Sequence, residues 1–129
     1  MKKEIIICII IIITIIIGNI ITQNYSQKTF NDLGKKLEIL REDLVKEDVE
    51  KILVNERISE IENIWKNVHN KLAIFIEHEE LEKTETSLAG LKSYTEMEEY
   101  ADAVEELDKM NFLMEHIEDK NKFILRNIF

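Results

Sequence analysis

An unbroken apolar run lies close to the N-terminus of this chain. Residues 5 to 21 contain 13 isoleucines and no charged residue. A helix of this length measures about 25 Å, which is near the lower limit for crossing the hydrocarbon core of a bilayer. Because a backbone in lipid must satisfy its own hydrogen bonds, we expect a helix although isoleucine is β-branched. The run predicts a transmembrane helix.

After this run, apolar residues recur at alternating intervals of four and three, a spacing that places them along one face of a helix. The chain has no proline and three glycines, so the residues that usually separate strands are almost missing. We therefore expect helices throughout. The three apolar stripes are Phe30, Leu33, Leu37, Leu40 and Leu44; Val54, Ile58, Ile61, Trp65, Val68, Leu72 and Phe75; and Tyr100, Ala103, Leu107, Met110, Met114, Ile117, Ile124 and Ile128.

Interruptions in these stripes indicate where the helices end. Asp48 is a candidate N-cap for the second helix of the soluble part. Ser93 with Glu96 and Thr95 with Glu98 are overlapping candidate capping boxes before the last helix. The predicted elements are an anchor at residues 4–26 and helices near residues 28–46, 49–78, 80–94 and 97–126.

Each of these helices presents an apolar stripe and needs a partner in water. Short connections favour antiparallel neighbours. We predict an all-α protein, with an N-terminal transmembrane helix followed by a small antiparallel helical bundle or two stacked helical hairpins. Residues 1–26 would form the membrane anchor, and residues 27–129 an acidic soluble domain. The expected core includes Trp65, Leu72, Phe75, Leu107, Met110, Met114 and Ile117.

Three other interpretations of the apolar run fit the sequence less well. A cleaved signal peptide needs a small-residue cleavage site, which "GNIITQNYSQ" lacks. A lipoprotein signal has its cysteine after the apolar stretch, whereas Cys8 lies near its start. A core segment that is apolar on all sides would need more neighbours than so short a chain supplies. Lys2 and Lys3 favour a cytoplasmic N-terminus, so we expect a single-pass cell-membrane protein whose bulk is extracytoplasmic.

The charge of the rest of the chain is strongly acidic. From residue 5 onward there are 15 basic and 25 acidic residues. This balance argues against nucleic acid as a partner, because phosphate binding needs clustered lysine and arginine. It also argues against a domain that lies flat on anionic lipid. Since Cys8 is the only cysteine, intrachain disulfides and cysteine-based zinc sites are excluded.

Two Glu-His pairs recur in similar surroundings, 38 positions apart. "IFIEHEELEK" contains Glu77 and His78, and "FLMEHIEDKN" contains Glu115 and His116. The offset is about the length of one helical-hairpin repeat, but only three identities fall within the 20 aligned positions from 72 to 91. A duplicated unit and a coincidence both remain open.

Apolar residues precede both pairs. Phe75 ends an apolar stripe just before the first pair, and Leu113 and Met114 come directly before the second. We expect both pairs to lie beside helix–helix contacts, with these apolar residues buried. Glu77 and Glu115 should be exposed.

Histidine beside carboxylates also suggests metal binding. "HEELE" places Glu82 where the zincin motif His-Glu-x-x-His needs its second histidine. The Glu-x-x-His motif of di-iron bundles does not occur in the sequence. His78, Glu82 and Glu85 share one helical face, and His116 is a further candidate ligand from another helix. Such charge runs are usually solvated faces, so we predict no metal and no cofactor.

The sequence offers no arrangement for nucleophilic catalysis. None of its serines stands in a Gly-x-Ser-x-Gly setting, and no glycine-rich loop is present to cradle phosphate. Trp65 lies on an apolar stripe, so we expect a core anchor rather than a ligand-stacking surface. We predict that the protein is not an enzyme, and the sequence identifies no small-molecule substrate.

The order of these features resembles a known family. After the anchor come "IW..VH..L..FIEHEELEK...SL..L" and, towards the C-terminus, "L....FL.EHIEDK......NIF". The chain is similar to small single-pass membrane proteins of Gram-positive, mostly clostridial, bacteria known as domain of unknown function 4363. The positions that carry the resemblance are Trp65, His78, Glu79, Leu81, His116, Ile117, Asn127, Ile128 and Phe129.

The family has no established activity, so the resemblance supplies no catalytic residues. It implies a membrane location, and it implies that the Glu-His pairs belong to a family pattern. Neighbouring genes in some members point to a second small membrane protein as a partner.

These observations together favour binding over catalysis. We expect a membrane-tethered helical protein-interaction module, acting as a scaffold or accessory subunit of a bacterial membrane complex, that binds a protein partner or itself. The alternative is an extracytoplasmic metal- or pH-responsive sensor that uses the Glu-His pairs at 77–78 and 115–116, because histidine titrates close to neutral pH.

Overall fold

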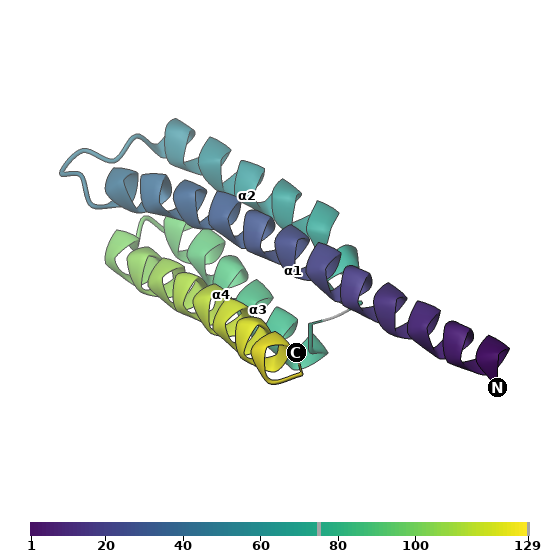
Figure 1. The fold of residues 1–129 in the computed structure, drawn as a ribbon. Coiled ribbons are helices and arrows are strands. Elements are labelled where there is room, and N and C mark those ends of the chain that lie inside the picture. The colour runs from purple at the N-terminus through teal and green to yellow at the C-terminus, as the bar shows by residue number, and fades with distance from the viewer. Residues whose placement is uncertain (75, 129) are drawn as a thin grey trace.

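The structure, a computed structural model, describes residues 1–74 and 76–128, with the side chains of 123–125, 127 and 128 outside the description. Four helices follow one another along the chain (Figure 1), and the described residues contain no strand. The all-α prediction is confirmed. The helices are α1 (Lys2–Leu44), α2 (Lys51–Leu72), α3 (His78–Glu96) and α4 (Tyr100–Ile128).

The helices form an up-and-down bundle. Each helix contacts two others, in the ring α1–α2, α2–α3, α3–α4 and α4–α1, and neighbours run antiparallel (Figure 1). Short connections between successive helices produce this topology because each helix must turn back on its predecessor to cover its apolar stripe.

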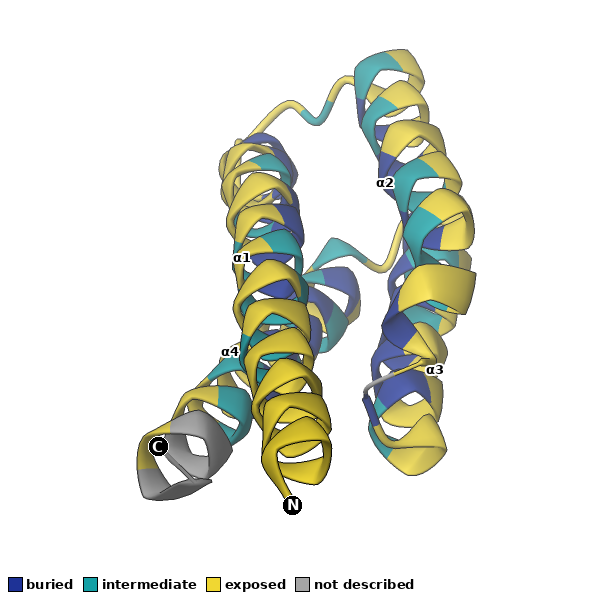
Figure 2. Ribbon diagram, turned by 45° about the vertical axis from the view of Figure 1, so that its right-hand side comes forward, coloured by how far each residue is buried: buried dark blue, intermediate teal, exposed yellow. Residues whose placement is uncertain are grey.

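Most members of the predicted stripes form the core of the bundle, against which Val68 and Tyr100 pack partly buried. The side chains of Ile124 and Ile128 lie outside the description. Figure 2 shows the buried residues gathered on the inward sides of the helices. Three leucines of α3, namely Leu81, Leu88 and Leu91, complete the core from a helix for which the sequence had given no stripe. Phe75 lies outside the described residues. The other six predicted core residues are at most 2% exposed: Trp65, Leu72, Leu107, Met110, Met114 and Ile117.

The expected boundary between anchor and domain near residue 27 is not a break in the helix. α1 runs without interruption from Lys2 to Leu44. The polar segment 22–28 contains neither proline nor glycine, so nothing in it ends a helix. Burial against the bundle begins at Ser26, Thr29 and Phe30, within this same helix.

The predicted helix starts were also partly wrong. Ser93 and Thr95 lie inside α3, and the Thr95 hydroxyl donates to the carbonyl of Leu91 (2.8 Å) instead of capping α4. The N-cap of α2 is Glu50 rather than Asp48, and it makes no side-chain cap hydrogen bond. A short polar side chain inside a helix bonds readily to the preceding turn, so the capping pattern alone did not locate the ends.

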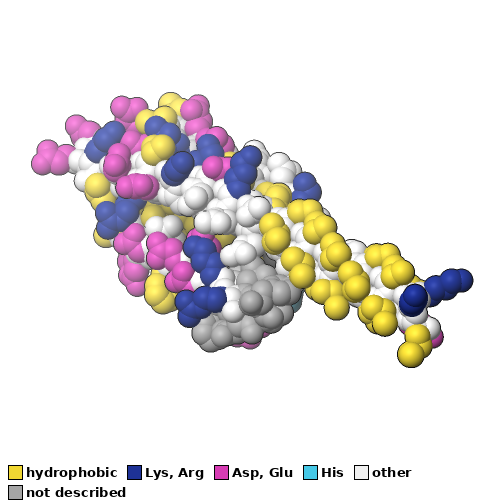
Figure 3. Space-filling view, in the orientation of Figure 1, with side chains coloured by type: hydrophobic (Ala, Val, Ile, Leu, Met, Phe, Trp, Pro, Cys, Tyr) yellow, Lys and Arg dark blue, Asp and Glu magenta, His cyan; other side chains and the backbone are white. Residues whose placement is uncertain are grey.

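The N-terminal part of α1 projects from the bundle as an apolar rod (Figure 3). α1 is the one described helix that is long and apolar enough to cross a membrane, and its apolar stretch is not buried by the rest of the chain. We refer to residues 5–21 as the candidate span. The α2–α3 turn and the end of α4 lie at the end of the bundle from which this rod emerges (Figure 1).

Candidate functional site

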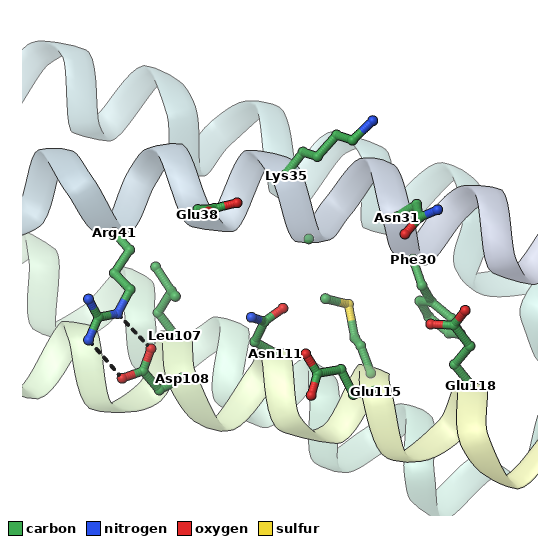
Figure 4. A pocket seen from close by; sticks show the side chains of 12 residues that line it. Phe30, Asn31, Lys35, Glu38, Arg41, Leu107, Asp108, Asn111, Glu115 and Glu118 are labelled. Carbon is green, nitrogen blue, oxygen red and sulfur yellow. Dashed lines mark hydrogen bonds and ion pairs between the residues drawn. The ribbon is translucent and has the colours of Figure 1, made fainter.

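A groove of about 530 Å³ runs between α1 and α4, on the outside of the bundle (Figure 4). The bundle topology places these two helices side by side although they are the first and the last in the chain. α1 and α4 contribute six lining residues each. They are Phe30, Asn31, Gly34, Lys35, Glu38 and Arg41 from α1, and Leu107, Asp108, Asn111, Met114, Glu115 and Glu118 from α4.

The centre of the groove is open because Gly34 has no side chain. A Cβ atom at Gly34 would lie 3.8 Å from Oδ1 of Asn111, an ordinary contact distance. The apolar lining residues Phe30, Leu107 and Met114 are at most 4% exposed. A molecule in the groove would therefore meet mainly amide and charged groups, over a narrow apolar floor.

A bidentate ion pair between Arg41 and Asp108 closes one end of the groove. Arg41 donates from Nε to Oδ1 of Asp108 (2.9 Å) and from Nη2 to Oδ2 of Asp108 (3.4 Å). The hydrogen bond to Asp108, with the attraction between the two charges, raises the pKa of Arg41. Figure 4 shows this pair at one end and Glu115 and Glu118 towards the other. Amides, carboxylates and cations at these positions suit the recognition of a polar peptide or side chain.

Glu77, of the first Glu-His pair, joins the α2–α3 turn to α4. It is the N-cap residue of α3, and its carboxylate accepts a hydrogen bond from Nζ of Lys120 on α4 (2.9 Å). Glu80 accepts a second bond from the same amine (3.2 Å). These two bonds, that to Glu77 first, raise the pKa of Lys120. Glu77 is exposed, as predicted, and directly follows the buried Ile76.

The first group of candidate metal ligands is divided between two pairings. Nε2 of His78 lies 3.8 Å from Oε1 of Glu82, and both side chains are largely exposed. Glu85 instead lies near α2, where its Oε2 is 3.9 Å from Nε2 of His69. The helical face that the sequence predicted is present, but its members face different partners.

The second Glu-His pair lies in the middle of α4. Glu115 lines the groove, whereas the His116 ring stacks on Phe112 with their centroids 6.5 Å apart. Phe112 is 67% exposed. Of the apolar residues expected to be buried before this pair, Met114 is buried but Leu113 is only half-buried. Leu113 lies one position off the inward stripe and lines a shallow outer depression between α3 and α4.

The two Glu-His pairs thus have different surroundings, at the start of one helix and inside another. No group of three or more histidine, cysteine, aspartate or glutamate side chains able to hold a metal ion occurs among the described residues. Sequence reasoning overlooked the α1–α4 groove. Its signals were a glycine inside an amphipathic helix and asparagines beside the apolar stripes, at Gly34, Asn31 and Asn111.

A family match covers the bundle. The family described as Domain of unknown function (DUF4363) matches residues 20–128. No curated protein and no solved structure matches the chain.

Proposed function

This chain belongs to the DUF4363 family, and we propose that it is a membrane-tethered interaction module that acts as a scaffold or accessory subunit of a membrane complex. It works by binding a protein partner rather than by catalysis, and the α1–α4 groove is the binding surface. Lys2 and Lys3 support an orientation in which the bundle is extracytoplasmic.

The observation that carries this proposal is the continuity of α1. The helix that contains the candidate span also forms one wall of the groove, without an intervening linker. A continuous helix rises about 1.5 Å per residue, so Gly34 in the groove is held about 20 Å beyond the end of the span. A fixed height above the bilayer favours the recognition of another membrane protein, since the partner meets the groove in one register.

Photo-crosslinking in native membranes tests this proposal. A photoreactive residue in place of Asn111 should give a discrete crosslinked product, identifiable by mass spectrometry. Asn63 is a matched control because it is an exposed asparagine on α2. It lies one helical turn from Glu60, which pairs with Lys36 of α1, so Asn63 and the groove are at a similar height above the bilayer. Products of equal yield from both positions, or none from position 111, would contradict the proposal.

Filling the groove supplies the second half of the test. Gly34→Trp should abolish the crosslink from position 111, because an indole would occupy the space above Asn111. Gly34→Ala should preserve it, since a single Cβ makes only ordinary contact there. Circular dichroism of both variants checks that the bundle is still folded.

The sensor alternative makes a different prediction. His78 and His116 are both exposed and lie on different helices. We expect the variant in which both are replaced by glutamine to have the same melting temperature as the unmodified protein at each pH between about 5 and about 8, with and without zinc. A pH- or zinc-dependent shift in the unmodified protein that disappears in the double variant would favour the sensor.

A further inference from the structure

The α2–α3 turn holds an exposed isoleucine at the end of the bundle that faces the candidate span. Ile74 is 84% exposed. The turn around it is ordered by backbone hydrogen bonds, from Ala73 to His69 (2.9 Å) and from Ile74 to Lys71 (3.3 Å). The backbone of Ile74 is therefore held at the end of α2, and its apolar side chain is exposed.

A contact between α1 and α2 fixes the height of this turn. Nζ of Lys71, in the last turn of α2, lies 5.8 Å from the centroid of the Tyr25 ring on α1. Tyr25 comes four residues after Ile21, the last residue of the candidate span, which corresponds to about 6 Å along a helix. The interfacial layer on each side of a bilayer is about 5–8 Å thick. α2 runs towards the span, so Ile74 lies at or below the level of Tyr25, inside this layer.

The other groups at this height have interfacial chemistry. Tyrosine is enriched at membrane–water interfaces, where its ring lies among the headgroups. Lysine and arginine extend their apolar stems along such a surface and place the charge at the phosphates. Lys71, Lys28 and Arg126 are exposed at this end of the bundle, Arg126 on the last turns of α4.

The charge of the bundle also favours contact between this end and the bilayer. The segments nearer the candidate span, 22–34, 62–86 and 112–128, hold 7 basic and 10 acidic residues. The segments farther from it, 35–61 and 87–111, hold 8 basic and 15 acidic residues. The stronger negative charge thus lies away from the bilayer, which lowers the repulsion from anionic lipid when the bundle stands on its end.

We propose that the α2–α3 turn is a second membrane contact, in which Ile74 inserts into the interfacial layer of the bilayer that α1 crosses, while Lys71 and Arg126 meet lipid phosphates. The bundle then stands upright on two supports, the span of α1 and the turn. This contact goes beyond the proposed function, although it rests on the membrane insertion of residues 5–21.

Depth-dependent fluorescence quenching tests the contact. The full-length chain carries Cys8→Ala, so that a cysteine introduced at Ile74→Cys is the sole attachment site for an environment-sensitive fluorophore. It is reconstituted in phosphatidylcholine–phosphatidylglycerol vesicles that contain a lipid with a spin label near the headgroup. Ile52→Cys is the matched control, because Ile52 is also an exposed isoleucine (77%) but lies at the opposite end of α2. Flotation with the vesicles verifies insertion of the span separately.

We expect several-fold stronger quenching at position 74 than at position 52, with blue-shifted emission only at position 74. Equal quenching at the two positions in protein that floats with the vesicles would overturn the proposal. Shielding of the position-74 probe in native membranes but not in these vesicles would assign the turn to a protein partner, and would overturn it as well.

Discussion

At the scale of single residues, the connection between α3 and α4 depends on an unusual backbone at Glu98. Among the described residues, it is the one non-glycine residue with a positive φ, of 60°. Its N–H donates to Thr95 (3.1 Å), and the N–H of Glu99 donates to Tyr94 (2.9 Å). This is the Schellman pattern, in which the left-handed position is usually glycine.

Substitution of Glu98 should reveal the cost of this conformation. A Cβ atom in the left-handed region costs about 1–2 kcal/mol, which the greater freedom of unfolded glycine partly offsets. We expect Glu98→Gly to be more stable than Glu98→Ala by about 1 kcal/mol in thermal or denaturant unfolding. Both variants lose the ion pair with Lys51, so their difference isolates the backbone. Equal stabilities would mean that the helix end is not built as described.

Asp43 is a buried acidic residue at the end of α1, where it joins α1 to α2. Its carboxylate accepts a hydrogen bond from Nζ of Lys46 (2.9 Å) and forms an ion pair with Nε of Arg57 on α2 (2.5 Å). The hydrogen bond from Lys46, with the nearby charge of Arg57, lowers the pKa of Asp43, although burial acts against this. Because its pKa is lower in the folded state than in the unfolded chain, Asp43 stabilises the fold above the unfolded pKa of about 4. That contribution is lost as the pH falls through the folded pKa.

Asp43→Asn should therefore destabilise the bundle at neutral pH by about 1–2 kcal/mol. The deficit should shrink as the pH falls below the unfolded pKa of about 4 and disappear below the folded pKa, because the unfolded chain takes up a proton on this carboxylate before the folded protein does. Urea unfolding across this range measures it. Asp48→Asn, at an exposed aspartate of the connection that follows α1, should change little. If the loss in free energy of unfolding stayed constant with pH, the charge of Asp43 would not be what stabilises the fold.

At the scale of the helices, Gly34 and Gly90 are both helical glycines, but their surroundings differ. A Cβ at Gly34 would be 3.8 Å from Asn111. At Gly90 it would lie 3.0 Å from both Cγ and Cδ of Glu106, on α4. Glycine inside a helix costs about 0.5–1 kcal/mol relative to alanine. We expect Gly34→Ala to stabilise by about that amount.

Gly90→Ala should stabilise the bundle less than Gly34→Ala does, or destabilise it, since the Glu106 side chain must move away from the new Cβ. Adding Glu106→Ala should restore much of the difference, because it removes both atoms of the contact. Thermal unfolding of the three variants is sufficient. If Gly90→Ala proved as stabilising as Gly34→Ala, α3 and α4 would not approach each other as closely as the structure has them.

The helices themselves could be predicted from sequence, because burial follows the spacing of Val54, Ile58, Ile61 and Trp65, and the structure buries all four. Helix ends were less predictable, since Thr95 satisfies its hydroxyl within its own helix. The continuity of α1 through segment 22–28 fits the absence of proline and glycine there, but the change from apolar to polar composition does not by itself show whether the helix continues.

At the scale of the whole molecule, the candidate site was the least predictable part. The groove exists because α1 and α4 close the ring, which brings Arg41 to Asp108 across 67 positions of the chain. Nothing local to either residue indicates that pairing. The Glu-His pairs were visible in the sequence, but their different surroundings depend on the turn to α3 and on the position of Lys120.

One uninterrupted helix, α1, joins the candidate span to the bundle, and we propose that it holds the bundle at a fixed height above the bilayer. A nitroxide scan of residues 19 to 30 in vesicles, with Cys8→Ala as background, measures this continuity. Spin-label mobility and oxygen accessibility should oscillate with a period of about 3.6 residues across the whole range, with restricted mobility at Ser26 and Phe30, which are buried. A loss of periodicity with high mobility between residues 22 and 28 would instead reveal a flexible linker between the candidate span and the bundle.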